Sequence, residues 1–165
     1  MTADPSAQPN FFELYLNEQK AAWQNQYSAT IFSVFDHWLS EEEAKAALDP
    51  YFAWVGGEQA SPASVLEIEE PYLAFFEAMA QQGRLVRWRG DQQHPIDNLD
   101  EARSVALQAA REIDPMWLVE QETDTHLLPL HDLTLIAAVP IGQSLDHAAR
   151  WAAQAGLYQL WSSNL

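Results

Sequence analysis

From residue 84 to residue 161, apolar positions follow strand and helix patterns in a regular order. Short runs rich in branched and aromatic side chains predict strands over 84–89, 116–119, 133–139 and 157–161. Apolar residues three and four positions apart predict helices over 98–113 and 144–155. Asn98 and Glu101 have the spacing of a capping box, and Gly156 is suited to end the second helix.

The order of these elements is βαββαβ, which predicts a ferredoxin-like two-layer sandwich with two helices on one face of a sheet. Right-handed crossovers favour this arrangement. The same elements in another order would give a different α+β domain. We therefore expect an α+β fold in which residues 84–165 form the ferredoxin-like part.

Residues 10–83 have the pattern of several helices packed on that sheet, after a proline-rich segment over residues 1–9 that we expect to be disordered. Ser40 and Glu43 form a second capping-box pattern. Pro50 and Pro71 each predict the start of a new helix. One helical stripe at spacings of three and four consists of Ile31, Val34, Phe35, Trp38 and Leu39, which places Trp38 in the core. We expect both halves to form one compact unit.

The charge of the chain restricts its possible partners, because the formal net charge is −16. Such a field repels nucleic acid and anionic membranes and attracts a basic protein. The chain contains no cysteine, shows no signal-peptide pattern at its first residues and has no apolar run long enough to span a membrane. We expect a soluble, cytoplasmic protein that is a monomer or a homodimer.

The chemistry-bearing residues form no motif that names a reaction, and there is no glycine-rich phosphate loop. We therefore predict a non-catalytic interaction protein without a cofactor, such as an inhibitor or immunity-type protein that neutralises a basic partner. A solvated acidic face is the simpler interpretation of the same residues. The predicted partner-binding residues are acidic side chains and one tryptophan: Glu41, Glu42, Glu43, Glu58, Glu67, Glu69, Glu70 and Trp151.

The alternative function is a small-molecule or metal site, in an enzyme or a sensor. Imidazole and carboxylate side chains lie in a predicted loop between two strands, where they can converge on a metal ion. Their spacing matches no standard metal motif, and a polar loop would also contain them. These weak metal candidates are Asp124, His126, His131 and Asp132. Asp36 and His37 are a further pair, but adjacent residues on the predicted helix would point apart.

Overall fold

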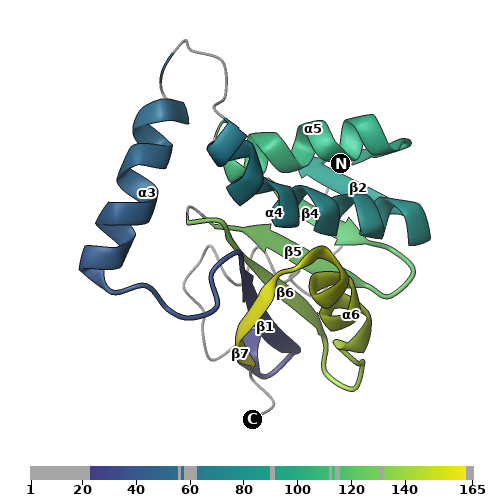
Figure 1. The fold of residues 1–165 in the computed structure, drawn as a ribbon. Coiled ribbons are helices and arrows are strands. Elements are labelled where there is room, and N and C mark those ends of the chain that lie inside the picture. The colour runs from purple at the N-terminus through teal and green to yellow at the C-terminus, as the bar shows by residue number, and fades with distance from the viewer. Residues whose placement is uncertain are drawn as a thin grey trace.

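The computed structural model describes residues 23–55, 57, 63–89, 92–111, 113, 116–130 and 132–162. Within these ranges the chain forms four helices and a seven-stranded antiparallel sheet (Figure 1). The fold class is therefore mixed α+β, as predicted. The segment over residues 1–9 lies outside the described residues. None of the described helices combines the length and the apolar character that crossing a membrane requires.

The strands are β1 (Tyr27–Ser33), β2 (Leu85–Arg89), β3 (Gln92–Pro95), β4 (Trp117–Glu120), β5 (Thr125–Pro129), β6 (Thr134–Pro140) and β7 (Tyr158–Ser162). The helices are α3 (Glu41–Val55), α4 (Ala63–Gln82), α5 (Leu99–Ala110) and α6 (Asp146–Ala155).

The sheet has the strand order β3-β2-β4-β5-β6-β1-β7. All four strands predicted from the sequence are present, as β2, β4, β6 and β7. The ferredoxin-like arrangement is not confirmed, because the sheet has seven strands. Strand β5 separates β4 from β6, and β1 separates β6 from β7. The additional strands β1, β3 and β5 come from segments that the sequence pattern assigned to a helix or to loops.

The predicted helix that contained Ile31 is wrong, because residues 27–33 form β1, which lies between β6 and β7 in the sheet. Ile31 and Ala29 lie toward one face of the sheet, and Phe32 and Thr30 lie toward the other. Both faces of β1 therefore carry buried residues, and its first five residues, 27–31, alternate between apolar and polar as in a strand. The apolar spacing that resembled a helix arises from the end of a strand and the loop after it.

The helix boundaries confirm the predicted caps but not the predicted proline breaks. The backbone N–H of Glu101 donates to the side chain of Asn98 over 2.9 Å, and Gly156 has the left-handed φ of 85° of a helix C-cap. Helices α3 and α4, however, each continue through an internal proline, Pro50 and Pro71. Packing of the surrounding turns outweighs the loss of one backbone hydrogen bond at each proline.

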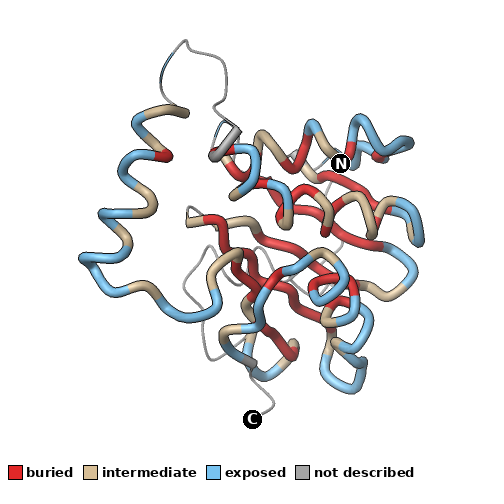
Figure 2. The backbone as a smooth tube through the Cα atoms, viewed as in Figure 1, coloured by how far each residue is buried: buried red, intermediate tan, exposed pale blue. Residues whose placement is uncertain are grey.

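Two layers hold the structure together. Helices α4, α5 and α6 cover one face of the sheet (Figure 1), and the buried residues of the main core lie between these helices and the strands (Figure 2). Its largest fully buried members include Tyr72, Phe75 and Phe76 of α4. A smaller cluster around Ala29, Leu128 and Ile136 lies on the opposite face. Helix α3 stands beside these layers and is largely exposed along its length (Figures 1 and 2).

Candidate partner-binding site

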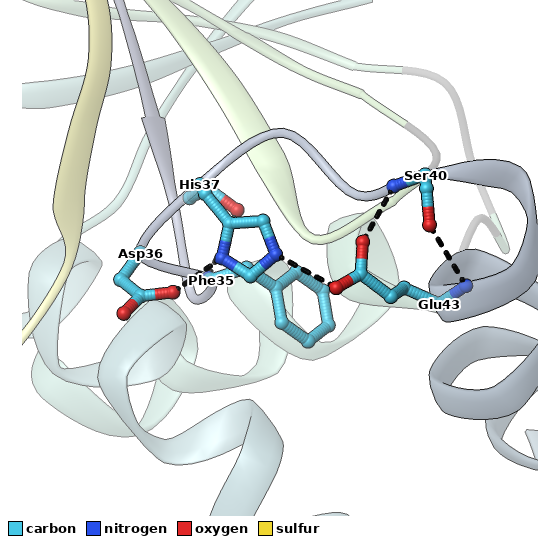
Figure 3. A network of polar contacts seen from close by, with 6 residues as sticks. Phe35, Asp36, His37, Ser40 and Glu43 are labelled. Carbon is cyan, nitrogen blue, oxygen red and sulfur yellow. Dashed lines mark hydrogen bonds and ion pairs between the residues drawn. The ribbon is translucent and has the colours of Figure 1, made fainter.

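The loop from β1 to α3 holds a network of polar side chains that the sequence pattern did not predict (Figure 3). The Nδ1 atom of His37 lies 2.6 Å from Oδ1 of Asp36, and its Nε2 atom lies 3.2 Å from Oε1 of Glu43. The expectation that Asp36 and His37 point apart is therefore wrong, because this segment is a loop and not a helix. The network joins the loop that follows strand β1 to the first turn of α3.

The capping box predicted at the start of α3 belongs to the same network. The backbone N–H of Ser40 donates to Oε2 of Glu43 over 2.8 Å, and the N–H of Glu43 donates to Oγ of Ser40 over 3.3 Å. One carboxylate therefore binds both the helix cap and the imidazole of His37. These contacts fix the direction in which the chain leaves the loop and enters the helix.

The electrostatics of this loop favour a charged imidazole. Hydrogen bonds to Asp36 and then to Glu43 raise the pKa of His37 above its ordinary value. Hydrogen bonds from Ser40, and then the contact with His37, lower the pKa of Glu43. Both ring nitrogens of His37 face carboxylate oxygens, so the protonated ring can donate to each of them. A ring engaged in this way is suited to holding the loop in place and not to accepting a proton from a substrate.

Trp38, the residue after this histidine, is 55% exposed, so its predicted place in the core is wrong. It lines a cleft of about 410 Å³ together with two other tryptophans, Trp23 and Trp161. Trp23 and Trp38 lie on either side of β1 in the sequence, whereas Trp161 comes from β7 near the other end of the described chain. The remaining lining residues are Gln24, Ala29, Ile31, Leu130 and Ile136. The cleft is therefore a largely apolar surface with large aromatic side chains around it.

The floor of the cleft is the sheet face that lies opposite helices α4, α5 and α6. Ile31 of β1 pairs with Ile136 of β6 on one side and with Trp161 of β7 on the other. This register places the three side chains in a row across the sheet. Trp23 comes from the chain just before β1, and Trp38 comes from the loop after it. The arrangement could accept a flat or elongated group, and indole faces also attract cations.

Several carboxylates lie close to Trp38 in the sequence. Asp36 is two residues from Trp38, which is at most about 7 Å of chain. The adjacent first turn of α3 carries three exposed acidic residues, Glu41, Glu42 and Glu43. Glu41 contacts Lys45 at 2.6 Å, an exposed pair of the kind that contributes little to stability. We call the group formed by Asp36, Trp38 and Glu41–Glu43 the acidic loop.

The other predicted acidic residues do not belong to this group. Glu67 and Glu70 are exposed on α4, and Glu70 contacts Arg103 of α5 at 2.6 Å. This part of α4 adjoins Tyr51, which lies ten residues beyond Glu41 and therefore about 15 Å along α3. The predicted acidic surface is thus divided between the two ends of α3. Glu58 lies outside the described residues.

Two predicted partner-binding residues are buried. Glu69 is fully buried and accepts hydrogen bonds from Nε and Nη2 of Arg111 over 2.7 and 2.8 Å and from the hydroxyl of Tyr51 over 2.9 Å. Trp151 is 4% exposed and donates its indole N–H to Gln82 over 3.0 Å. Neither side chain is available to a partner, because both are buried. Sequence spacing alone did not reveal this burial, since it depends on how α3 and α6 pack against α4.

The weak metal candidates do not converge. Residues 125–129 form strand β5 and not a loop, so Asp124 and His126 lie at one end of it and Asp132 lies beyond the other, about 13 Å of strand away. Asp124 contacts His126 at 3.3 Å, whereas Asp132 accepts a hydrogen bond from the hydroxyl of Thr134. His131 lies outside the described residues. In the described ranges, no three histidine or acidic residues are grouped so that they could hold a metal ion.

Comparisons of the chain with models of known protein families, with curated proteins and with solved structures give no match. Its function therefore has to be argued from the site itself. The sequence contained one local signal of the acidic loop, a tryptophan between an aspartate and a run of three glutamates. It contained no signal that Trp23, Trp38 and Trp161 would meet, because that meeting depends on the strand order.

Proposed function

We propose that this chain is a non-catalytic acidic protein that binds a basic protein partner, in the manner of an inhibitor or immunity-type protein. The observation that carries the proposal is the acidic loop, in which the exposed Trp38 lies within five residues of four exposed carboxylates. An exposed tryptophan offers a large contact area at a low cost in side-chain entropy, because it has only two rotatable side-chain bonds.

The charge of the chain supports this function in a second way. A net charge of −16 attracts a basic protein before contact, and this attraction increases the association rate more than the final affinity. Affinity in protein interfaces comes mainly from a few large side chains near the centre of the contact. The acidic loop combines both components, because its carboxylates can steer the partner and Trp38 can anchor it.

Affinity capture of the tagged protein from a lysate of its own source, at low and at high salt, tests the proposal. Mass spectrometry of the retained proteins should identify one basic protein near equal stoichiometry, and salt should release it. Exposed charge pairs are screened strongly above about 0.15 M salt, where the Debye length is about 8 Å. The proposal is contradicted if no protein is retained, or if the retained protein is acidic and resists salt.

A further inference from the structure

We infer that the cleft between Trp23, Trp38 and Trp161 receives an arginine side chain of the partner. This inference rests on the proposed function and specifies the chemistry of its contact. The cleft lies next to the acidic loop and shares Trp38 with it. Its volume of about 410 Å³ falls within the usual range of ligand pockets, about 300–1,000 Å³.

The lining of the cleft matches the two parts of an arginine side chain. Its floor consists of apolar side chains such as Ile31 and Ile136, on which the methylene stem can pack. Its tryptophans offer indole faces to the guanidinium, which is planar and more weakly hydrated than an ammonium group. A compact lysine ammonium would lose more hydration energy on the same surface.

Charge complementarity selects a cation over an apolar group. The lining residues of the cleft carry no formal charge, so a cation buried there alone would lose its hydration without compensation. Asp36 belongs to the same loop as Trp38, and its side chain is 69% exposed while it contacts His37. A guanidinium at the mouth of the cleft can therefore remain partly hydrated, stack on indole and interact with a carboxylate.

The same combination already occurs within this chain. The guanidinium of Arg111 lies 5.3 Å from the centre of the Trp54 ring while it binds the carboxylate of Glu69. That internal site joins α5 to α3 and α4. The cleft offers a corresponding pair of groups, an indole and a nearby carboxylate, to an arginine from outside.

The test uses protein in which the tryptophans are labelled with ¹⁵N. A peptide is titrated into this protein, and NMR follows the indole N–H signals. Single Trp→Phe variants assign each signal to its residue. The probe is the peptide acetyl-Gly-Arg-Gly-amide, and its counterparts carry lysine or the neutral isostere citrulline. We expect the signals of Trp23, Trp38 and Trp161 to shift with the arginine peptide. The citrulline peptide should produce less than a third of that shift, and buried Trp151 should not respond.

Two outcomes would overturn the inference. Equal shifts with the arginine and citrulline peptides would show a cleft for uncharged groups, and the absence of any shift at high millimolar peptide would show that it is not an arginine site. An Asp36→Asn variant refines the test, because losing one exposed charge contact should weaken arginine binding about 2–5-fold. An unchanged affinity for the arginine peptide would show that the carboxylate of Asp36 does not contribute to the proposed site.

A matched capture experiment separates this inference from the proposed function. A Trp38→Ala bait should retain at least tenfold less of the basic partner than the unmodified bait does. If it retains the same amount and salt still releases the partner, the inference fails while the proposed function stands. If the unmodified bait retains no basic protein but the arginine-specific shifts occur, the proposed function fails and the cleft keeps its arginine specificity.

Discussion

The imidazole of His37 lies 3.2 Å from the carboxylate of Glu43, and this contact ties the loop after strand β1 to the first turn of α3. The same carboxylate accepts the backbone N–H of Ser40. Trp38 lies between these two anchor points in the sequence, so the contacts restrain its backbone on both sides. The candidate site therefore consists of a hydrogen-bonded loop and an exposed aromatic side chain, and each part leads to separate predictions.

The contact of His37 predicts a pH dependence of stability. Its folded-state pKa is raised, so its contribution is fully present below about pH 6.5, the ordinary histidine value, and is lost as the pH rises through the folded pKa. The melting temperature of the unmodified protein should exceed that of a His37→Gln variant at pH 6 by more than at pH 8.5. A difference that stays constant or grows toward pH 8.5 would contradict this assignment.

That comparison also removes the opposite effect of a second histidine. Burial lowers the pKa of His126, although Asp124 partly offsets this, so His126 destabilises the fold as the pH falls. Both proteins in the comparison contain His126, and its contribution cancels in their difference. Without the variant, the two histidines would partly mask each other in a single pH profile.

The buried carboxylate of Glu69 predicts a large loss of stability. A Glu69→Ala substitution removes the partner of Arg111 and of the Tyr51 hydroxyl, and breaking a buried ion pair typically costs about 3–5 kcal/mol. Urea unfolding should show this loss. The control is Glu70→Ala, which removes an exposed contact with Arg103 and should cost about 1 kcal/mol or less. Equal losses in the two variants would contradict the structural role of Glu69.

Gly83 predicts a steric requirement just before β2. A Cβ at this position would lie 2.1 Å from Oε1 of Glu120, a carboxylate held in place by the backbone N–H groups of Arg84, Glu122 and Thr123. Gly83→Ala should therefore destabilise the protein by about 1–3 kcal/mol, the usual cost of overpacking. In a Glu120→Ala background the same substitution should cost less, because its obstacle is absent. An undiminished cost there would show that the clash is not its cause.

The tryptophans predict opposite effects on stability. Trp38→Ala should change the free energy of unfolding by about 0.5 kcal/mol or less, since the side chain is exposed. Trp151→Ala should cost about 3–5 kcal/mol, because that indole is buried between α6 and α4 and bonded to Gln82. A large loss with Trp38→Ala would indicate that this residue is part of the core and not of a binding surface.

The sequence predicted most accurately the elements whose signals are local. The caps at Ser40 and Asn98 depend on side chains three residues apart, and Gly156 depends on one backbone angle. These contacts form within one helical turn, so neighbouring residues contain the information. The helix-breaking effect of Pro50 and Pro71 was overestimated, because tertiary packing keeps both helices continuous.

Strands β1 and β5 were harder to predict for a physical reason. Strand β1 pairs with β6 and β7, whose partner residues follow it by roughly a hundred positions or more, so no local pattern marks its neighbours. Strand β5 begins with Thr125 and His126, which resemble loop residues in sequence although both are buried. The tryptophan cleft depends on the same long-range pairing, and it therefore becomes visible only once the strand order is known.

The most direct test of the proposed function compares two variants with the same net charge. Glu41→Gln/Glu42→Gln neutralises two acids in the first turn of α3, and Asp100→Asn/Glu101→Gln does the same in the first turn of α5. The salt concentration that releases the captured basic partner would be measured for each bait. We predict that the α3 variant releases the partner at clearly lower salt than the α5 variant, which should resemble the unmodified protein. If both variants released the partner at the same salt concentration, this would contradict a specific role of the acidic loop.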